Sequence, residues 1–193
     1  MKNIILFGDS ITAGYLEEAV SPILVNMVKQ KLQQAAIEEV TIINGGMPGD
    51  TTVDGLARMA VDVLAETPDL VVIFFGANDA STARKVSLAA YQQNLITMIQ
   101  TIGPEKVILV TAPYTDSARK PDRPQDRIRE NVAVGLTLRE TYHIPVINLF
   151  EEMVSAPDTD QLLQADGLHF TQAGYELLST LIVQAIKGRL KAN

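Results

Sequence analysis

Short apolar runs alternate along the chain with longer segments that carry apolar residues at helical spacing. A run of four to six apolar or β-branched residues is typical of a buried strand, and helical spacing predicts an amphipathic helix. The run at 70–75 is apolar at every position, as a strand covered on both faces should be. The predicted strands are residues 4–7, 40–44, 70–75, 107–110 and 146–150.

The segments between these strands carry helix signals. Ser21 and Pro22 predict the start of the first helix, because serine caps a helix and proline suits its first position. Another helix is expected from Gln125 to about Tyr142. The helix after the second strand is expected to bury a stripe made of Val53, Leu56, Met59, Ala60 and Val63.

Five alternations of strand and helix predict an α/β fold, with a parallel sheet between two layers of helices. The length suits one domain, 1–193, with a sizeable core. In such a sheet, ligands bind beyond the carboxyl ends of the strands. The polar residues that follow the strands should therefore gather at one edge of the sheet, and Ser10, just after the first strand, should lie there.

Composition narrows the possible functions. The chain has 16 Lys and Arg against 23 Asp and Glu, a net charge of −7, which disfavours nucleic-acid binding. It has no cysteine, which excludes disulfides, thiolate metal sites and a cysteine nucleophile. We expect no signal peptide, because the N-terminus enters the first strand with no charged leader or apolar h-region. We expect no membrane span, because no apolar run approaches ~20 residues, and a cytoplasmic location is the default expectation. An oligomeric state is not predicted.

Ser10 needs a base before its hydroxyl can act as a nucleophile. The chain has two histidines. His143 precedes the fifth strand, at the wrong edge of the sheet, and is expected in a solvated loop. His169 follows that strand, and Asp166 is close enough in sequence to orient its ring. The alternative is a loop whose Asp166 and His169 only cap backbone groups.

Gly49 and Asn78 are candidates for holding an oxyanion. A backbone N–H and a side-chain amide are the donor types that such sites use, and the Ser10 N–H would be a third donor. Taken singly, a loop glycine and a strand-end asparagine usually serve a turn. Asp9 would repel a nearby oxyanion, so we expect it to turn away and bind loop backbone. Asp79 is given the same structural interpretation.

Together these residues resemble the four sequence blocks of the SGNH or GDSL hydrolases. Gly8-Asp9-Ser10 is similar to the first block, Gly49-Asp50-Thr51 to the second, Gly76-Ala77-Asn78-Asp79 to the third and Asp166-Gly167-Leu168-His169 to the fourth. The resemblance implies a three-layer, flavodoxin-like α/β/α domain with a five-stranded parallel sheet. It also implies hydrolysis of esters or thioesters without metal or cofactor, by Ser10, His169 and Asp166 with an oxyanion hole of Ser10, Gly49 and Asn78.

The expected function is therefore that of a serine esterase or acylhydrolase acting on a small carboxylic ester. The third and fourth blocks look most like those of the isoamyl-acetate-hydrolysing esterases. The second block looks more like that of bacterial thioesterases and lysophospholipases. Hydrolysis of a thioester or a lysophospholipid therefore remains an alternative. A flavodoxin-like module that binds flavin without hydrolysis is a rival, although the chain has no Trp to cover a flavin. A receiver-like domain is a weaker rival, since no lysine follows the fifth strand. The loop 112–124, with Arg119, Lys120 and Arg123, is expected either to shape the substrate pocket or to be solvated.

Overall fold

The protein is built on a five-stranded parallel sheet. The structure, a computed structural model, describes residues 2–192, with side chains through residue 190. The strand order is β4-β1-β5-β6-β7, and a separate two-stranded hairpin, β2-β3, follows β1. The strands are β1 (Lys2–Gly8), β2 (Tyr15–Leu16), β3 (Ala19–Val20), β4 (Val40–Gly46), β5 (Leu70–Phe74), β6 (Val107–Val110) and β7 (Val146–Ile147).

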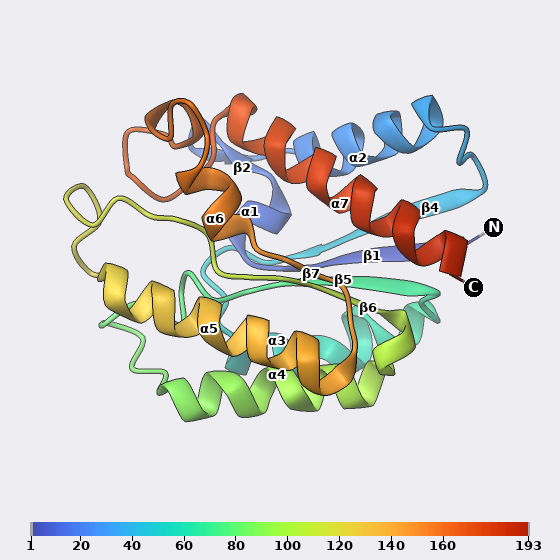
Figure 1. Ribbon diagram of the computed structural model, residues 1–193, viewed down its shortest axis with the longest axis horizontal. Helices are drawn as coiled ribbons and strands as arrows, with labels where there is room; N and C mark the ends of the chain where they lie inside the picture. Colours follow the sequence, from blue (N-terminus) through green and yellow to red (C-terminus); the bar gives the residue numbers. More distant parts are fainter. Residues whose placement is uncertain (1, 193) are drawn as a thin grey trace.

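Helices cover both faces of the sheet, which confirms the predicted three-layer fold. Figure 1 shows α2 and α7 on one side of the sheet and α3, α4 and α5 on the other. Among residues 2–192, no helix combines the length and the apolar composition that crossing a membrane requires. The helices are α1 (Ser10–Ala13), α2 (Ile23–Gln34), α3 (Thr52–Asp62), α4 (Leu88–Ile102), α5 (Gln125–Tyr142), α6 (Leu149–Val154) and α7 (Gln172–Ala192), with short 3₁₀ turns at Leu64–Glu66, Pro104–Lys106 and Asp160–Leu162.

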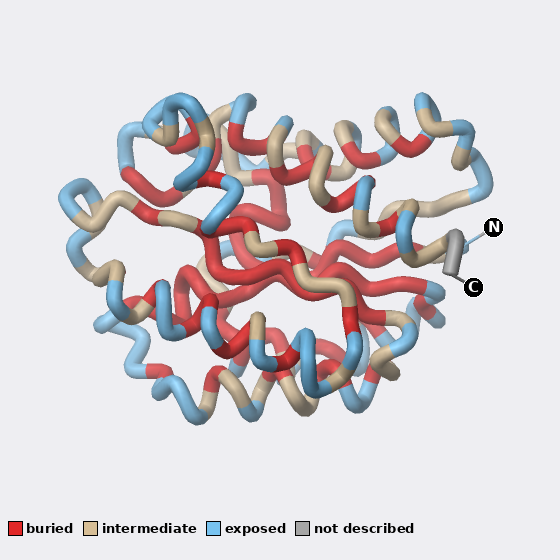
Figure 2. Tube along the Cα trace, viewed as in Figure 1, coloured by how far each residue is buried: buried red, intermediate tan, exposed pale blue. Residues whose placement is uncertain are grey.

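The sheet lies at the centre of the core, and its central strands β1, β5 and β6 are buried on both faces, whereas the edge strand β4 is partly exposed (Figure 2). In β1, Ile4 and Leu6 pack with α2 and α7, whereas Ile5 and Phe7 pack with α3 and α4. This alternation follows from the two-residue period of a strand. It explains why the apolar runs in the sequence are continuous rather than alternating with polar residues.

The strand order places the ends of β1 and β5 side by side. Gly8 is in register with Gly46 of β4 on one side and with Phe74 of β5 on the other. The chain runs from β1 outward to β4 and then crosses back to β5, so the order reverses at β1. Open α/β sheets bind ligands at such a switch point, beyond the carboxyl ends of the strands.

Gly8 lets the chain fold back sharply at the end of β1. A Cβ atom at this position would lie 2.3 Å from the Phe74 carbonyl oxygen and 2.1 Å from Oγ1 of Thr12. Only glycine permits so close an approach of backbone and side chain. The short helix α1 therefore begins immediately beyond the strand and presents Ser10 in its first turn.

Several predicted element boundaries differ from the structure, and two of the differences have a clear local cause. The fifth strand ends at Ile147 rather than at residue 150, because Oδ1 of Asn148 accepts a hydrogen bond from Glu151 N at 3.3 Å and caps α6. Ser21 does not cap α2: its hydroxyl donates to the Gly14 carbonyl at 3.0 Å, and the helix begins at Ile23.

The buried face of α3 also differs from the predicted stripe. Val53 is 52% exposed and Ala60 lies on the solvent side, whereas Thr52, Gly55 and Met59 face the core. Gly55 packs closely against Phe75, since a Cβ there would lie 2.7 Å from its ring. Thr52 and Gly55 therefore pack against the core in the place that the apolar spacing predicted for Val53.

Candidate active site

Ser10 is held at the start of α1 by its neighbour. Oδ1 of Asp9 accepts a hydrogen bond from Ile11 N at 3.0 Å, which caps the helix as expected for Asp9. Ser10 is almost fully buried, and its Oγ lies 3.0 Å from Nε2 of His169. The structure thus joins a hydroxyl and an imidazole that are 159 positions apart in the sequence.

Asp166 fixes the other side of the His169 ring. Its Oδ2 lies 2.5 Å from Nδ1 of His169, and its Oδ1 accepts hydrogen bonds from the backbone N–H groups of Leu168 and His169, each at 3.0 Å. Burial disfavours the charged form, but these hydrogen bonds outweigh it and keep the pKa of Asp166 below its ordinary value. The carboxylate is therefore ionised beside the ring at neutral pH.

The ring of Tyr15 covers His169. The two ring centroids are 4.2 Å apart, with the planes tilted by 40°. The Tyr15 carbonyl accepts hydrogen bonds from the Tyr175 hydroxyl at 3.0 Å and from Nε2 of Gln164 at 3.3 Å. The β2-β3 hairpin is thereby fastened to α7 and to the segment that carries His169, which limits the orientations open to the imidazole.

Two backbone N–H groups beside the serine have no protein acceptor. Among the described residues, neither Ser10 N nor Gly49 N donates a hydrogen bond. Both residues line the same pocket. Gly49 has φ +85°, a conformation that favours glycine, and its carbonyl accepts a hydrogen bond from Nη2 of Arg84 at 2.7 Å. Unpaired N–H groups at a pocket wall are suited to bind an anionic oxygen.

Asn78 is oriented by three neighbours. Its Oδ1 accepts from Nη2 of Arg123 at 2.7 Å, and its Nδ2 donates to the Asp50 carbonyl at 2.9 Å and approaches Oδ2 of Asp9 at 3.4 Å. Arg123 is itself buried, and its Nε donates to the Ala77 carbonyl at 3.1 Å. The carboxamide therefore has a fixed orientation, with one N–H left in only a long contact.

Two further carboxyl groups lie beneath the site. Burial raises the pKa of Asp9 to about 7, with the Ile11 N–H opposing this shift and the Asp79 carboxylate adding to it. Burial also raises the pKa of Asp79, which accepts from the Thr52 N–H at 3.0 Å and its hydroxyl at 2.5 Å. Asp79 thus ties the strand-end loop to α3, as its structural interpretation predicts.

Arg58 of α3 clamps the ends of two strands. It donates from Nη2 to the Gly8 carbonyl and from Nη1 to the Gly45 carbonyl, both at 2.9 Å. Its Nε pairs with Oδ2 of Asp50 at 2.6 Å, and its guanidinium stacks 4.6 Å from the Phe7 ring centroid. One side chain therefore holds the strand that precedes Ser10 and the loop that precedes Gly49.

A pocket of about 370 Å³ opens over these residues. Loop 112–124 contributes Lys120 and Arg123 to the pocket wall, in line with the expectation that this loop shapes the substrate pocket. Arg119 of the same loop forms ion pairs with Asp116 and Asp160 instead. His143 ends α5 and is exposed, as expected. The pocket is lined by Ser10, Tyr15, Pro48, Gly49, Asn78, Arg84, Lys120, Arg123, Leu168 and His169.

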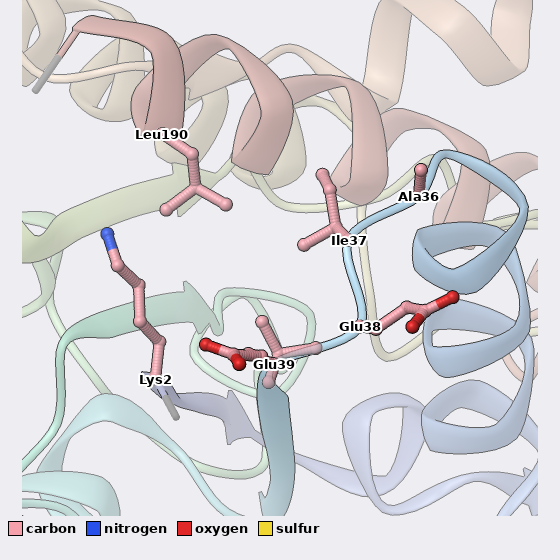
Figure 3. A pocket seen from close by; sticks show the side chains of 7 residues that line it. Lys2, Ala36, Ile37, Glu38, Glu39 and Leu190 are labelled. Atoms are coloured by element: carbon pink, nitrogen blue, oxygen red, sulfur yellow. The ribbon is translucent and has the colours of Figure 1, made fainter.

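A second hollow, of about 410 Å³, lies at the opposite edge of the sheet. Figure 3 shows Lys2 from the start of β1 and Leu190 from α7 on either side of it, with Glu38 and Glu39 on the loop before β4. It contains no serine or histidine. Within the described residues, no group of three or more acidic or histidine side chains gathers as metal ligands would.

The site contains residues that sequence reasoning missed. Tyr15, Arg58 and Arg84 were not singled out, and Arg123 was noted only as a loop charge. None of these four residues belongs to a sequence motif that we could recognise, because each contributes to the site through a tertiary contact. The glycine and asparagine blocks, by contrast, were visible because short polar clusters directly follow apolar runs.

Comparisons with known proteins agree with this geometry. The family model for the GDSL-like lipase/acylhydrolase family matches residues 6–177. The chain is 59% identical to the lipase/acylhydrolase from Enterococcus faecalis, whose crystal structure superposes with a TM-score of 0.96 over 98% of this chain and 97% of that one. The predicted fold and family resemblance are confirmed.

Curated relatives include esterases of two kinds. An arylesterase of Vibrio mimicus is 40% identical over 81 residues, 40% of this chain and 38% of that protein, so the chain spans well under half of this relative's length. The isoamyl acetate-hydrolyzing esterase of Schizosaccharomyces pombe is 26% identical over 193 residues, 96% of this chain and 75% of that protein. The names of these relatives differ in substrate but agree in ester hydrolysis.

Proposed function

Because the chain belongs to the GDSL-like lipase/acylhydrolase family, we propose that it is a carboxylic ester hydrolase and that Ser10, His169 and Asp166 form its catalytic triad. The observation that carries this proposal is the 3.0 Å contact between Ser10 Oγ and His169 Nε2, with Asp166 on the other ring nitrogen. A nucleophile joined to a base, and a base joined to an orienting acid, define this class of site.

In the first half of the reaction, Ser10 Oγ attacks the ester carbonyl carbon as His169 Nε2 removes its proton. The carbonyl π electrons move to oxygen and give a tetrahedral oxyanion. The imidazolium then gives its proton to the leaving alkoxide oxygen, the bond to that oxygen breaks, and the acyl group stays on Ser10. Asp166 holds the ring in the required tautomer and stabilises its positive charge.

In this mechanism the oxyanion is held by donors from residues that line the pocket. We assign this role to the N–H groups of Ser10 and Gly49 and to the amide of Asn78. Two of these groups have no protein partner and the third has an N–H in only a long contact, so binding the oxyanion breaks no strong hydrogen bond. Asp9 opposes the oxyanion little when it is protonated, and its pKa of about 7 favours that form below neutral pH.

In the second half, water replaces the alcohol and the same steps run in reverse. His169 takes a proton from water as the water oxygen attacks the acyl carbonyl. Collapse of the new oxyanion releases the carboxylic acid, and His169 returns its proton to Ser10 Oγ. The enzyme ends each cycle unchanged, and the ester is divided into an acid and an alcohol. Thioesters would follow the same course with a thiol leaving group, and comparing esters with acyl thioesters by kcat/KM decides between them.

A serine substitution tests this assignment. Ser10→Ala should lower kcat for p-nitrophenyl acetate on the order of 10⁴-fold, because only the oxyanion donors and substrate binding remain. Ser155→Ala is the matched control, since Ser155 is exposed at the end of α6 and should leave the rate unchanged. A fluorophosphonate should label the native protein at Ser10. Native activity or unchanged labelling in Ser10→Ala would remove Ser10 from the mechanism.

A further inference from the structure

The active-site pocket has the opposite charge from the rest of the molecule. Acidic residues exceed basic ones by 23 to 16 over the whole chain. The pocket wall nevertheless carries three cations, Arg84, Lys120 and Arg123, and no carboxylate. A cleft lined by one sign of charge concentrates ligands of the other sign. This local reversal indicates an anionic ligand.

The three cations differ in how far protein groups already neutralise them. Arg123 is committed, because it binds Asn78, the Ala77 carbonyl and Asp122. Among the described residues, neither Lys120 nor Arg84 forms an ion pair within 4.0 Å. Lys120 and Arg84 therefore have charge and N–H groups available to a ligand.

Two carboxylates close to these cations already accept hydrogen bonds from other groups. Asp122 accepts from Arg123 at 2.8 Å and from the Ser81 hydroxyl at 3.0 Å. Asp54, which Arg84 influences, accepts from the N–H and the hydroxyl of Thr51. Both carboxylates feel the charge of a pocket cation, Lys120 for Asp122 and Arg84 for Asp54, but neither forms a direct ion pair with it.

The backbone fixes where the two free cations sit. The turn that carries Lys120 is closed by hydrogen bonds from Lys120 N to the Asp116 carbonyl at 2.7 Å and from Arg123 N to the Lys120 carbonyl at 3.1 Å. Arg84 binds the Gly49 carbonyl at 2.7 Å, which places its guanidinium beside one of the proposed oxyanion donors. The cations therefore belong to the rim of the site rather than to a freely moving loop.

We propose that Arg84 and Lys120 form a subsite for an anionic group, a carboxylate or a phosphate, carried by the ester substrate. This inference rests on the proposed function, because it places the anion on the molecule that Ser10 attacks. The pocket volume of about 370 Å³ suits a compact ester. The hollow in Figure 3 shows no such excess of cations, since it has one lysine and two glutamates.

The test compares esters that differ only in charge. For an anion on the acyl side, p-nitrophenyl hydrogen succinate is paired with p-nitrophenyl levulinate, in which a methyl group replaces one carboxylate oxygen. For an anion on the alcohol side, monoacetylglycerol phosphate is paired with monoacetylglycerol. The quantity measured is the ratio of kcat/KM for the anionic ester to that for the neutral ester, after subtraction of uncatalysed hydrolysis. Because both esters of a pair are hydrolysed by the same enzyme, a substitution that lowers activity toward both equally leaves this ratio unchanged.

The native enzyme should favour the anionic ester of at least one pair by about tenfold or more, the factor that a charge-assisted hydrogen bond supplies. Lys120→Met and Arg84→Met should each lower this ratio, and the double variant should bring it to about one. Lys29→Met, which removes an exposed charge on α2, should leave the ratio unchanged. Raising the ionic strength from ~0.01 M to ~1 M should also lower it, because the Debye length falls from ~30 Å to ~3 Å.

Two results would overturn the inference while leaving the proposed function intact. One is a native ratio near one for both pairs despite rapid hydrolysis of the neutral esters. The other is a ratio that stays high in the double variant while both rates fall together, which would mean that the cations act on the oxyanion. If instead Ser10→Ala hydrolyses the neutral esters as fast as the native enzyme, the proposed function itself fails.

Discussion

Nη2 of Arg123 donates to Oδ1 of Asn78 at 2.7 Å, and this contact decides which side of the Asn78 carboxamide carries the oxygen and which the nitrogen. A guanidinium has only donors, so the amide oxygen must face Arg123. The amide nitrogen is then directed toward the Asp50 carbonyl and Asp9. Arg123 thus acts through Asn78 as a positioning residue.

Arg123→Met should lower kcat on the order of 10²-fold, approaching the effect of deleting an oxyanion donor, with a smaller change in KM. Arg123→Lys should recover little of the loss, because an ammonium cannot reproduce the planar set of hydrogen bonds. The decisive measurement is a double-mutant cycle. If Arg123 acts through Asn78, Arg123→Met should cost much less in the Asn78→Ala enzyme than in the native one. Additive losses would refute the positioning role.

Asp9 should make the protein less stable as pH rises. Its folded pKa of about 7 lies above the unfolded value near 3.9, so between these values the folded state keeps a proton that the unfolded state has lost. Its stabilising contribution is full below about pH 4 and is lost as pH rises through 7, by about 1.4 kcal/mol per pH unit. Asp9→Asn retains the helix cap and should remove this slope. Urea unfolding of both proteins at several pH values measures the difference, and parallel curves would contradict the prediction.

Asp166 should change the free energy of unfolding with pH in the opposite direction from Asp9. Its folded pKa lies below the ordinary value, so its contribution is present above the unfolded pKa and is lost as pH falls through the folded one. Relative to Asp166→Asn, the native protein should therefore lose stability on acidification. If both variants shift the pH dependence in the same direction, the assigned environments of the two carboxyl groups are wrong.

Arg58→Met should lower the free energy of unfolding by about 2 kcal/mol or more, because it removes the side-chain hydrogen bonds to the Gly8 and Gly45 carbonyl groups and the ion-pair partner of Asp50 in a partly buried site. Thermal unfolding measures this. Arg139→Met, which removes an exposed arginine from α5, is the control and should change stability by less than ~0.5 kcal/mol. Equal stability losses would show that the strand-end clamp is unimportant.

Tyr15→Phe should retain activity, since the ring that packs on His169 remains. Tyr15→Ala should lower kcat by about tenfold, because the imidazole loses the surface that restricts its orientation. The two variants should be compared by kcat and by the Tm of each protein. A loss in Tyr15→Phe equal to that in Tyr15→Ala would assign the effect to the hydroxyl rather than to the ring.

The fold was predictable because its central strands are buried on both faces. The run from Leu70 to Phe74 could hardly be anything but a central strand, and the polar residues after each run had to meet at one edge. The end of β7 could not be predicted in the same way. Leu149 and Phe150 are as apolar as strand residues, and only the Asn148 cap turns them into a helix.

The candidate site was visible where it depends on local sequence and invisible where it depends on tertiary contact. Ser10 and His169 each stand in a short polar block, so a sequence reader can pair them. Arg58 reaches strand ends 50 and 13 residues away, and nothing near it in the sequence records those carbonyl groups. Val53 is a second example. Its helical spacing predicted a core position, but α3 packs on the sheet through Gly55 and leaves Val53 exposed.

The distance in sequence between Ser10 and His169 has a consequence for synthesis of the protein. His169 is translated 159 positions after Ser10, and the Tyr175 hydroxyl that binds the Tyr15 carbonyl is translated later still. A nascent or prematurely terminated chain that ends before His169 lacks the base that the proposed mechanism requires. Under the proposed mechanism, hydrolysis therefore begins only after the chain from β1 to the start of α7 has been translated and folded.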